Sequence, residues 1–275
     1  MTYGNIYGLI NFLKEKKIEL SKGMLEKVLE SQLESKHFKI LKEPEEIIEL
    51  FLYPFPTDNK YDFIMQMKSK VSFEELKSLV QMFDWKKNTM CYREFIRSCE
   101  NPNILADKEI LNLIASQDDH WKMLQLRLAC RNPNILADKE ILRLIASQDD
   151  PLKKEQLRLA CENSSILRDK VALRFIAKQD TLKKMRELRF ACENPNILVD
   201  KKILTLIAGQ DSFEKMSEVR SACENLNILP HKEVLNLIAS QDDHLKMLQL
   251  RLACENPSIL NDKEILNLIA SQDDH

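Results

Sequence analysis

The sequence is poor in glycine, which occurs four times in 275 residues. Tight turns with positive φ and loops that cradle phosphate depend on this residue, so four glycines cannot build a Gly-rich phosphate loop. The HExxH zinc motif and the nucleophile elbow are also missing. We therefore expect a helical protein that is not an enzyme and holds no cofactor.

Long apolar runs are missing as well. Charged residues interrupt every hydrophobic stretch, so none approaches the ~18 consecutive apolar residues of a membrane span. Segment 1–17 lacks the basic start, apolar centre and cleavage site of a secretory signal. These absences predict a cytoplasmic protein with no membrane partner.

The sequence also has no excess charge of either sign, since 41 basic and 43 acidic residues give a formal net charge of -2. A protein with this balance has no global field that attracts nucleic acid or acidic lipid. Binding to either would need a local basic patch.

An internal repeat is the strongest signal present. Cysteine occurs at 99, 130, 161, 192, 223 and 254, an interval of 31 residues each time, and only Cys91 lies outside this series. With offsets counted from that cysteine, each unit has Ile-Leu at 5 and 6, lysine at 9, leucine at 12, alanine at 16 and Gln-Asp at 18 and 19. Such a fixed period is typical of repeat proteins.

Each unit is predicted to form two antiparallel helices. The first begins after a capping residue at offset 8, which is aspartate in every unit except at His231, and its apolar offsets 11, 12, 14, 15 and 16 predict burial. The second begins after offset 20, where the predicted N-caps are Asp119, Asp150, Thr181, Ser212, Asp243 and Asp274. An Asn-Pro-Asn stretch is expected to form the return turn.

Two short helices cannot bury their apolar faces alone, and stacking of successive units solves this problem. We therefore predict an all-α fold, a right-handed α-solenoid of two-helix repeats over residues 99–275, with a helical cap region before it. The units begin at Cys99, Cys130, Cys161, Cys192, Cys223 and Cys254, the last being incomplete. The predicted last helix exposes an apolar face, which is compatible with end-to-end self-association or with a fragment of a longer array.

The repeat resembles a known pattern. R-L-A-C-R-N-P-N at 127–134, followed by Leu142, Ala146 and Asp149, is similar to the variant leucine-rich repeat family and to HEAT-like repeats. The resemblance covers about residues 97–275 and implies an α-solenoid, although this unit is longer than that of the family. The family's iron-sulfur cluster is not expected here, because Cys91 is the one cysteine before the repeats.

The amino-terminal part also has helical spacing, in Ile6–Leu13, Met24–Leu33, Ile47–Phe51 and Leu76–Phe83. Ser72 and Glu75 form a capping-box pattern before the fourth segment. We interpret 1–71 as a helical region and 72–98 as a possible degenerate capping repeat. A separate functional head domain is an open alternative.

The repeated polar residues have simple structural interpretations. Thiols at one repeat position are predicted to be core residues, since stacked helices lie ~8 to 10 Å apart and equivalent thiols cannot bridge. Arginine at offset 28, accompanied by aspartate at offset 19, is expected to bridge acidic or carbonyl groups of adjacent units. His120, His244 and His275 share an offset through repetition, so we expect no metal.

Positions that vary between units are where a partner can be recognised. Offsets 22, 25 and 29 share one face of the second helix, and we call these positions the second-helix ridge. Its residues proposed to bind a partner are Trp121, Leu124, Leu128, Leu152, Lys183, Arg186, Phe190, Leu245, Leu248 and Leu252. The remaining ridge positions hold Glu155, Leu159, Glu214, Ser217 and Ser221.

Apolar ends with a basic centre predict a scaffold that binds a peptide or protein. One alternative is that this face packs on the first helices of neighbouring units. The other is a single-stranded nucleic-acid binder that uses Lys183, Lys184, Arg186 and the recurring lysines at offsets 9 and 23.

Overall fold

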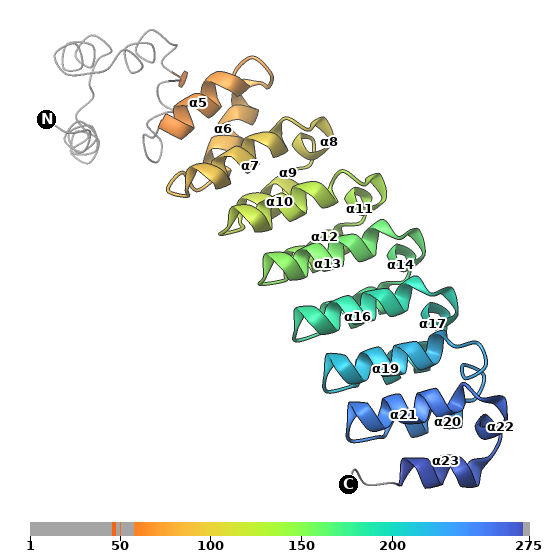
Figure 1. Ribbon diagram of the computed structural model, residues 1–275. Coiled ribbons are helices and arrows are strands. Elements are labelled where there is room, and N and C mark those ends of the chain that lie inside the picture. Colours follow the sequence, from red (N-terminus) through yellow and green to blue (C-terminus); the bar gives the residue numbers. More distant parts are fainter. Residues whose placement is uncertain (1–45, 48–49, 51–57, 272–275) are drawn as a thin grey trace, which may run out of the picture. The chain divides into compact units, whose positions relative to one another are not determined.

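The computed structural model describes residues 46–47, 50 and 58–271, which contain the 19 helices α5 to α23 and no strand. Figure 1 draws these helices and labels most of them. The predicted all-α class is confirmed for these residues. None of the described helices is both long and apolar enough to cross a membrane. The predicted helices Ile6–Leu13 and Met24–Leu33, most of Ile47–Phe51, the cap Asp274 and His275 lie outside the described residues.

Contacts divide the chain into two compact units, Met1–Met123 and Leu124–His275. The division falls inside helix α10 (His120–Ala129), which is one continuous helix. It does not coincide with the ranges 1–71, 72–98 and 99–275, which stay a prediction.

The described part of the first unit contains α5 (Asp58–Met67), α6 (Phe73–Met82), α7 (Thr89–Cys99), α8 (Pro102–Leu105) and α9 (Lys108–Ala115). The predicted capping box is confirmed, because Ser72 accepts from the Glu75 backbone and Glu75 accepts from the Ser72 backbone at 2.9 Å.

Aromatic rings fill the core of this unit. The centroid of Phe83 lies 4.6 Å from that of Phe95, and the centroid of Phe63 lies 5.3 Å from that of Trp85. All four residues are buried, so burial of large apolar side chains is what stabilises this part of the chain.

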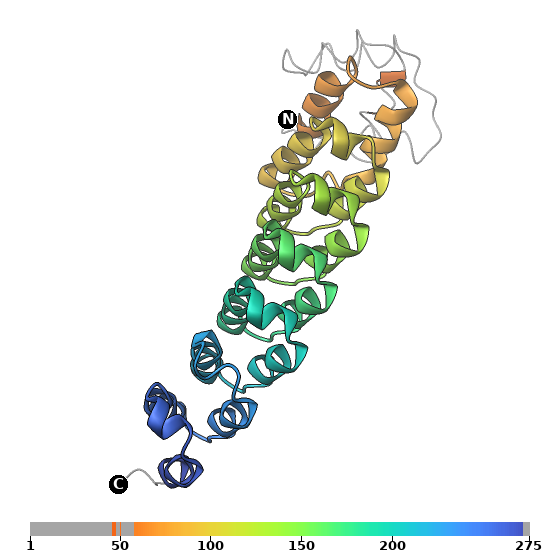
Figure 2. The same cartoon turned by 90° about the vertical axis from the view of Figure 1, so that its right-hand side faces the viewer.

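The second unit consists of two rows of helices (Figures 1 and 2). We call the longer ones second helices: α13 (Pro151–Glu162), α16 (Leu182–Glu193), α19 (Phe213–Glu224) and α21 (His244–Cys254). The first helices are α12 (Lys139–Ala146), α15 (Lys170–Ala177), α18 (Lys201–Ala208), α20 (Lys232–Ala239) and α23 (Lys263–Ala270). Each second helix packs on the next one, and so do the first helices from α12 to α20.

The predicted helix starts are confirmed wherever they are described. At offset 8, Asp107, Asp138, Asp169, Asp200 and Asp262 each accept a hydrogen bond from a backbone N–H of the following helix. At offset 20, Asp150, Thr181, Ser212 and Asp243 do the same, and Asp119 accepts from the Trp121 N–H at 2.8 Å. His231 makes no such bond, as expected where imidazole replaces a short carboxylate.

The prediction of a simple return turn is wrong for most units. The segment forms a short helix in α8, α11 (Pro133–Ala137), α14 (Ser164–Arg168), α17 (Pro195–Val199) and α22 (Pro257–Leu260). Asparagine at offset 2 caps each of them, and four begin with proline. The asparagine of Asn-Pro is thus the N-cap, and the proline takes the first helical position. A described unit with a short helix therefore has three helices rather than the predicted two.

One unit departs from this pattern. In the unit that begins at Cys223, Leu226 replaces the usual proline and Pro230 comes four residues later, and residues 226–230 form turns instead of a helix. Proline cannot supply a backbone N–H inside a short helix. The chain therefore enters α20 without the short helix or the side-chain cap found in other units.

The core lies between the two rows. Cys161, Cys192 and Cys223 from the second helices are buried together with Leu173 and Leu204 from the first helices. The positions that recur in every unit are therefore the ones that hold the rows together.

Candidate binding surface

The predicted second-helix ridge is a surface feature. Within the second unit, Leu152, Leu245 and Leu252 are about half exposed, at 51%, 49% and 50%. Lys183 and Arg186 are exposed, and the other ridge positions are partly exposed, namely Leu124, Leu128, Glu155, Leu159, Phe190, Glu214, Ser217, Ser221 and Leu248. No described ridge position is buried, so this face is not consumed by packing on the first helices.

Trp121 belongs to the first compact unit, Met1–Met123, and is 54% exposed. Its indole centroid lies 5.1 Å from the His120 ring, and the Trp121 backbone is held by Asp119 at the start of α10. An exposed tryptophan on a capped helix is a rigid apolar contact.

Arginines at offset 28 link neighbouring second helices. Arg220 Nε donates to Glu187 Oε2 at 3.0 Å on α16, and Arg220 also donates to Glu224 at 2.7 Å. Arg251 binds Glu218 and Glu255 in the same way, whereas Arg158 and Arg189 reach the side-chain oxygens of Gln125 and Gln156. The prediction that these guanidinium groups bridge adjacent units is confirmed, but their acidic partners are not the aspartates at offset 19.

Those aspartates bind lysines instead. Asp118, Asp149, Asp180, Asp211 and Asp242 each lie within 4.0 Å of the lysine four residues later, at offset 23. The hydrogen bond from Lys184, for example, holds the pKa of Asp180 below its ordinary value. The lysines at offset 23 are therefore neutralised along the surface.

Four lysines at offset 9 each lie beside a carboxylate of the preceding repeat unit, namely Lys170, Lys201, Lys232 and Lys263. Lys170 lies 3.0 Å from Asp138 and Lys232 lies 2.8 Å from Asp200. Lys201 forms the equivalent pair with Asp169. These lysines neutralise the helix-capping aspartates, so neither series of recurring lysines presents a free basic track to a phosphate backbone.

Lys183 and Arg186 differ from these lysines and arginines. Among the described residues no carboxylate lies within 4.0 Å of either group, and each contacts an aromatic ring. Lys183 Nζ lies 4.2 Å from the Phe213 centroid on α19, and Arg186 Cζ lies 5.6 Å from the Phe190 centroid. Phe213 lies outside the predicted site, and its signal was that offset 21 carries phenylalanine in this unit alone.

The cysteines are core residues, as predicted. All seven are buried and none forms a disulfide. Burial raises the pKa of Cys161, Cys192 and Cys223 to about 12 and that of Cys254 to about 11. Because the thiolate is the reactive form, these thiols are poor nucleophiles.

The raised pKa values predict a loss of stability in alkaline solution. Unfolded thiols lose their protons near the ordinary pKa of 9.0, whereas the folded thiols keep theirs until about 12. The free energy of unfolding should therefore fall as the pH rises from 9 towards 12. Urea unfolding across this range should show a shallower fall for Cys161→Ala/Cys192→Ala/Cys223→Ala. Equal slopes for wild type and variant would contradict the prediction.

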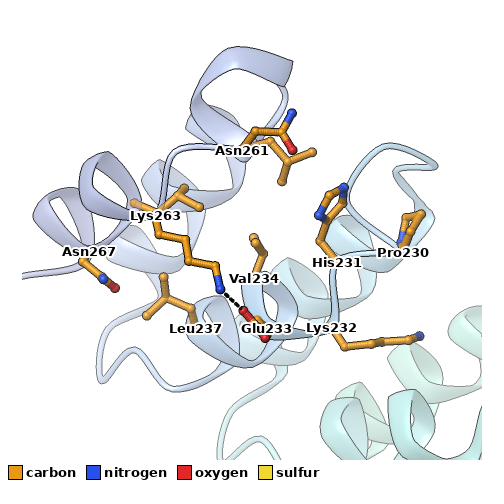
Figure 3. Close-up of a pocket in the computed structure, with 11 residues that line it drawn as sticks. Pro230, His231, Lys232, Glu233, Val234, Leu237, Asn261, Lys263 and Asn267 are labelled. Carbon is orange, nitrogen blue, oxygen red and sulfur yellow. Dashed lines mark hydrogen bonds and ion pairs between the residues drawn. The ribbon is translucent and has the colours of Figure 1, made fainter.

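A cavity of about 630 Å³ lies beside α20, α22 and α23 (Figure 3). It adjoins the unit that departs from the repeat, since His231 and Pro230 are among its residues. Its lining is apolar at Val234, Leu237, Leu260 and Leu266 and polar at Lys232, Glu233, Asn261, Lys263 and Asn267. Lys263 binds Glu233 at 2.7 Å, so its charges are largely satisfied within the protein.

The last described helix has its own exposed apolar positions, Ile265 at 40% and Leu268 at 61%.

Among the described residues no group of three or more His, Cys, Asp or Glu side chains could hold a metal ion. Among the described residues of the second helices, the ridge combines exposed leucines with Lys183 and Arg186, which have no carboxylate within 4.0 Å, and we therefore take it as the candidate surface.

Comparison with known proteins gave no match, whether to a family model, to a curated protein or to a solved structure.

Proposed function

We propose that this protein is a non-enzymatic, cytoplasmic scaffold that binds a peptide or protein on the second-helix ridge. In this proposal the repeats form a right-handed α-solenoid related to variant leucine-rich or HEAT-like repeats. The observation that favours the ridge is its contrast with its surroundings. Many repeated positions are buried or ion-paired, such as Cys223 and Lys215, whereas the ridge positions vary between units and none of them is buried. Arginine is among the residues that contribute most to binding energy at protein interfaces, and an apolar helix face is a common docking surface for a peptide or helix.

Single-stranded nucleic acid is the second candidate partner. Lys183 and Arg186 support it, since cations without carboxylate partners attract phosphate. The pairing of Lys184 with Asp180 and of the recurring lysines weighs against it. This alternative requires an affinity that falls steeply with salt.

Retention of partners from a lysate of the native cells tests the proposal. A Leu152→Ala/Leu245→Ala/Leu252→Ala variant is expected to lose a protein that the wild type retains at both low and high salt, because these leucines are about half exposed on the ridge. Losing three half-buried apolar anchors should weaken binding by at least about tenfold.

A control is Val171→Ala/Val199→Ala/Leu226→Ala, which removes three apolar side chains that are as exposed as the ridge leucines or more so (46%, 77% and 71%) and lie away from the ridge. This variant should retain the partner. Loss in both variants, or in neither, would remove the ridge from consideration. Nucleic acid retained at low salt alone would favour the second candidate.

A further inference from the structure

The basic centre of the ridge lies on one turn of α16. Lys183 and Arg186 occupy offsets 22 and 25. The same offsets of α13, α19 and α21 hold leucine, glutamate or serine. Both side chains are exposed. Every other surface lysine or arginine of α13, α16, α19 and α21 has an acidic partner within 4.0 Å.

Two aromatic rings hold these cations in place. Phe190 and Phe213 are the only phenylalanines in α13, α16, α19 and α21. The Phe213 ring lies beneath Lys183 at 4.2 Å, and the Phe190 ring lies near Arg186 at 5.6 Å and Arg189 at 4.4 Å. A cation over a ring face loses side-chain freedom but keeps N–H donors directed outward.

The acidic residues nearby do not neutralise the pair. Glu155 lies 3.9 Å from Arg158, and Glu187 binds Arg220 at 3.0 Å. Glu214 holds offset 22 on α19, yet its carboxylate is not within 4.0 Å of Lys183. The neighbouring lysines and arginines each lie beside a carboxylate of the protein. A carboxylate of a bound partner would give Lys183 and Arg186 the same kind of contact.

Leucines lie on both sides of this centre. Leu152 and Leu159 belong to α13, and Leu245 and Leu252 belong to α21. Packed helices lie ~8 to 10 Å apart, so the three steps from α13 to α21 cover roughly 30 Å, which an extended chain of about ten residues spans.

We propose that Lys183 and Arg186 bind the carboxylates of an acidic peptide segment whose flanking apolar side chains pack on the ridge leucines. This inference rests on the proposed function and names its partner class. Charge complementarity selects an acidic segment, and the leucines on both sides select apolar flanks.

Fluorescence anisotropy with labelled peptides tests the inference. The probe is Leu-Leu-Ser-Ser-Glu-Glu-Ser-Ser-Leu-Leu, and its matched control has glutamine in place of both glutamates. We expect the glutamate peptide to bind about tenfold more tightly at low salt, as two charge-assisted contacts would give. Lys183→Ser/Arg186→Ser should abolish this preference, so that the glutamate and glutamine peptides bind with equal affinity.

Lys215→Ser/Lys246→Ser is the charge-matched control variant, because both lysines lie beside an aspartate. It should keep the preference for glutamate. If both variants lose the preference for the glutamate peptide equally, the preference reflects net charge alone and the inference is overturned. Equal binding of the two peptides, weakened by the leucine variant, would overturn the inference while the proposed function stands.

Two further outcomes also overturn the inference. One is a labelled oligouridylate that binds more tightly than the glutamate peptide and is lost in Lys183→Ser/Arg186→Ser. The other is that neither peptide binds. The proposed function is then decided by the lysate experiment with the leucine variant, which does not depend on these peptides.

Discussion

Replacement of Leu188 by alanine should lower the free energy of unfolding by about 3 kcal/mol. The Leu188 side chain is completely buried on α16. This helix packs on α13 and α19 in its own row and on α15 and α18 in the other row. Neighbours on several sides prevent the walls of the new cavity from collapsing, so the cost exceeds the loss of transfer free energy.

Urea unfolding followed by circular dichroism measures this loss. The control is Leu252→Ala, the same change at a ridge position that is 50% exposed, where we expect less than about 1 kcal/mol. An unchanged slope with urea would show that the variant differs in stability and not in the compactness of its unfolded state. Equal losses at the two positions would contradict the burial pattern and the accessibility of the ridge together.

Lys154→Met should raise the free energy of unfolding by about 1 to 2 kcal/mol. Lys154 is completely buried at offset 24, where Met185, Met216 and Met247 are buried in the other units. Its ammonium group donates to the backbone oxygens of Ile145 and Ala146 at the end of α12. The helix dipole favours a cation there, but we expect the cost of removing the ammonium from water to exceed what its contacts return.

Thermal and urea unfolding of Lys154→Met and Lys154→Ala separate the two contributions. The alanine variant loses the side-chain packing as well, so its stability should fall by about 2 kcal/mol. A methionine variant less stable than the wild type would contradict the prediction. The carbonyl contacts of the ammonium would then outweigh its desolvation.

Much of the second unit could be predicted from the sequence because its signals are local. A helix start depends on a side chain that reaches a backbone N–H two or three residues away, as Asp138 and Asp200 do. Burial of Cys161 or Leu173 follows from spacing along one helix. The short helix at Pro133–Ala137 was missed because five residues are too few to show a helical period, although Asn132 and Pro133 signal its start.

The sequence by itself determined the helical class, the helix starts, the buried thiols and the face of each second helix that varies between units. Tertiary structure decided which charges are neutralised between helices, because such ion pairs depend on distances that spacing along one helix does not set. Pairs four residues apart, such as Lys184 with Asp180, are local. Tertiary structure placed Glu187 beside Arg220 and Asp138 beside Lys170, each more than 30 residues away in sequence. It also left Lys183 and Arg186 over aromatic rings without a carboxylate. That difference among chemically similar residues is a property of packing, which repeat spacing does not encode.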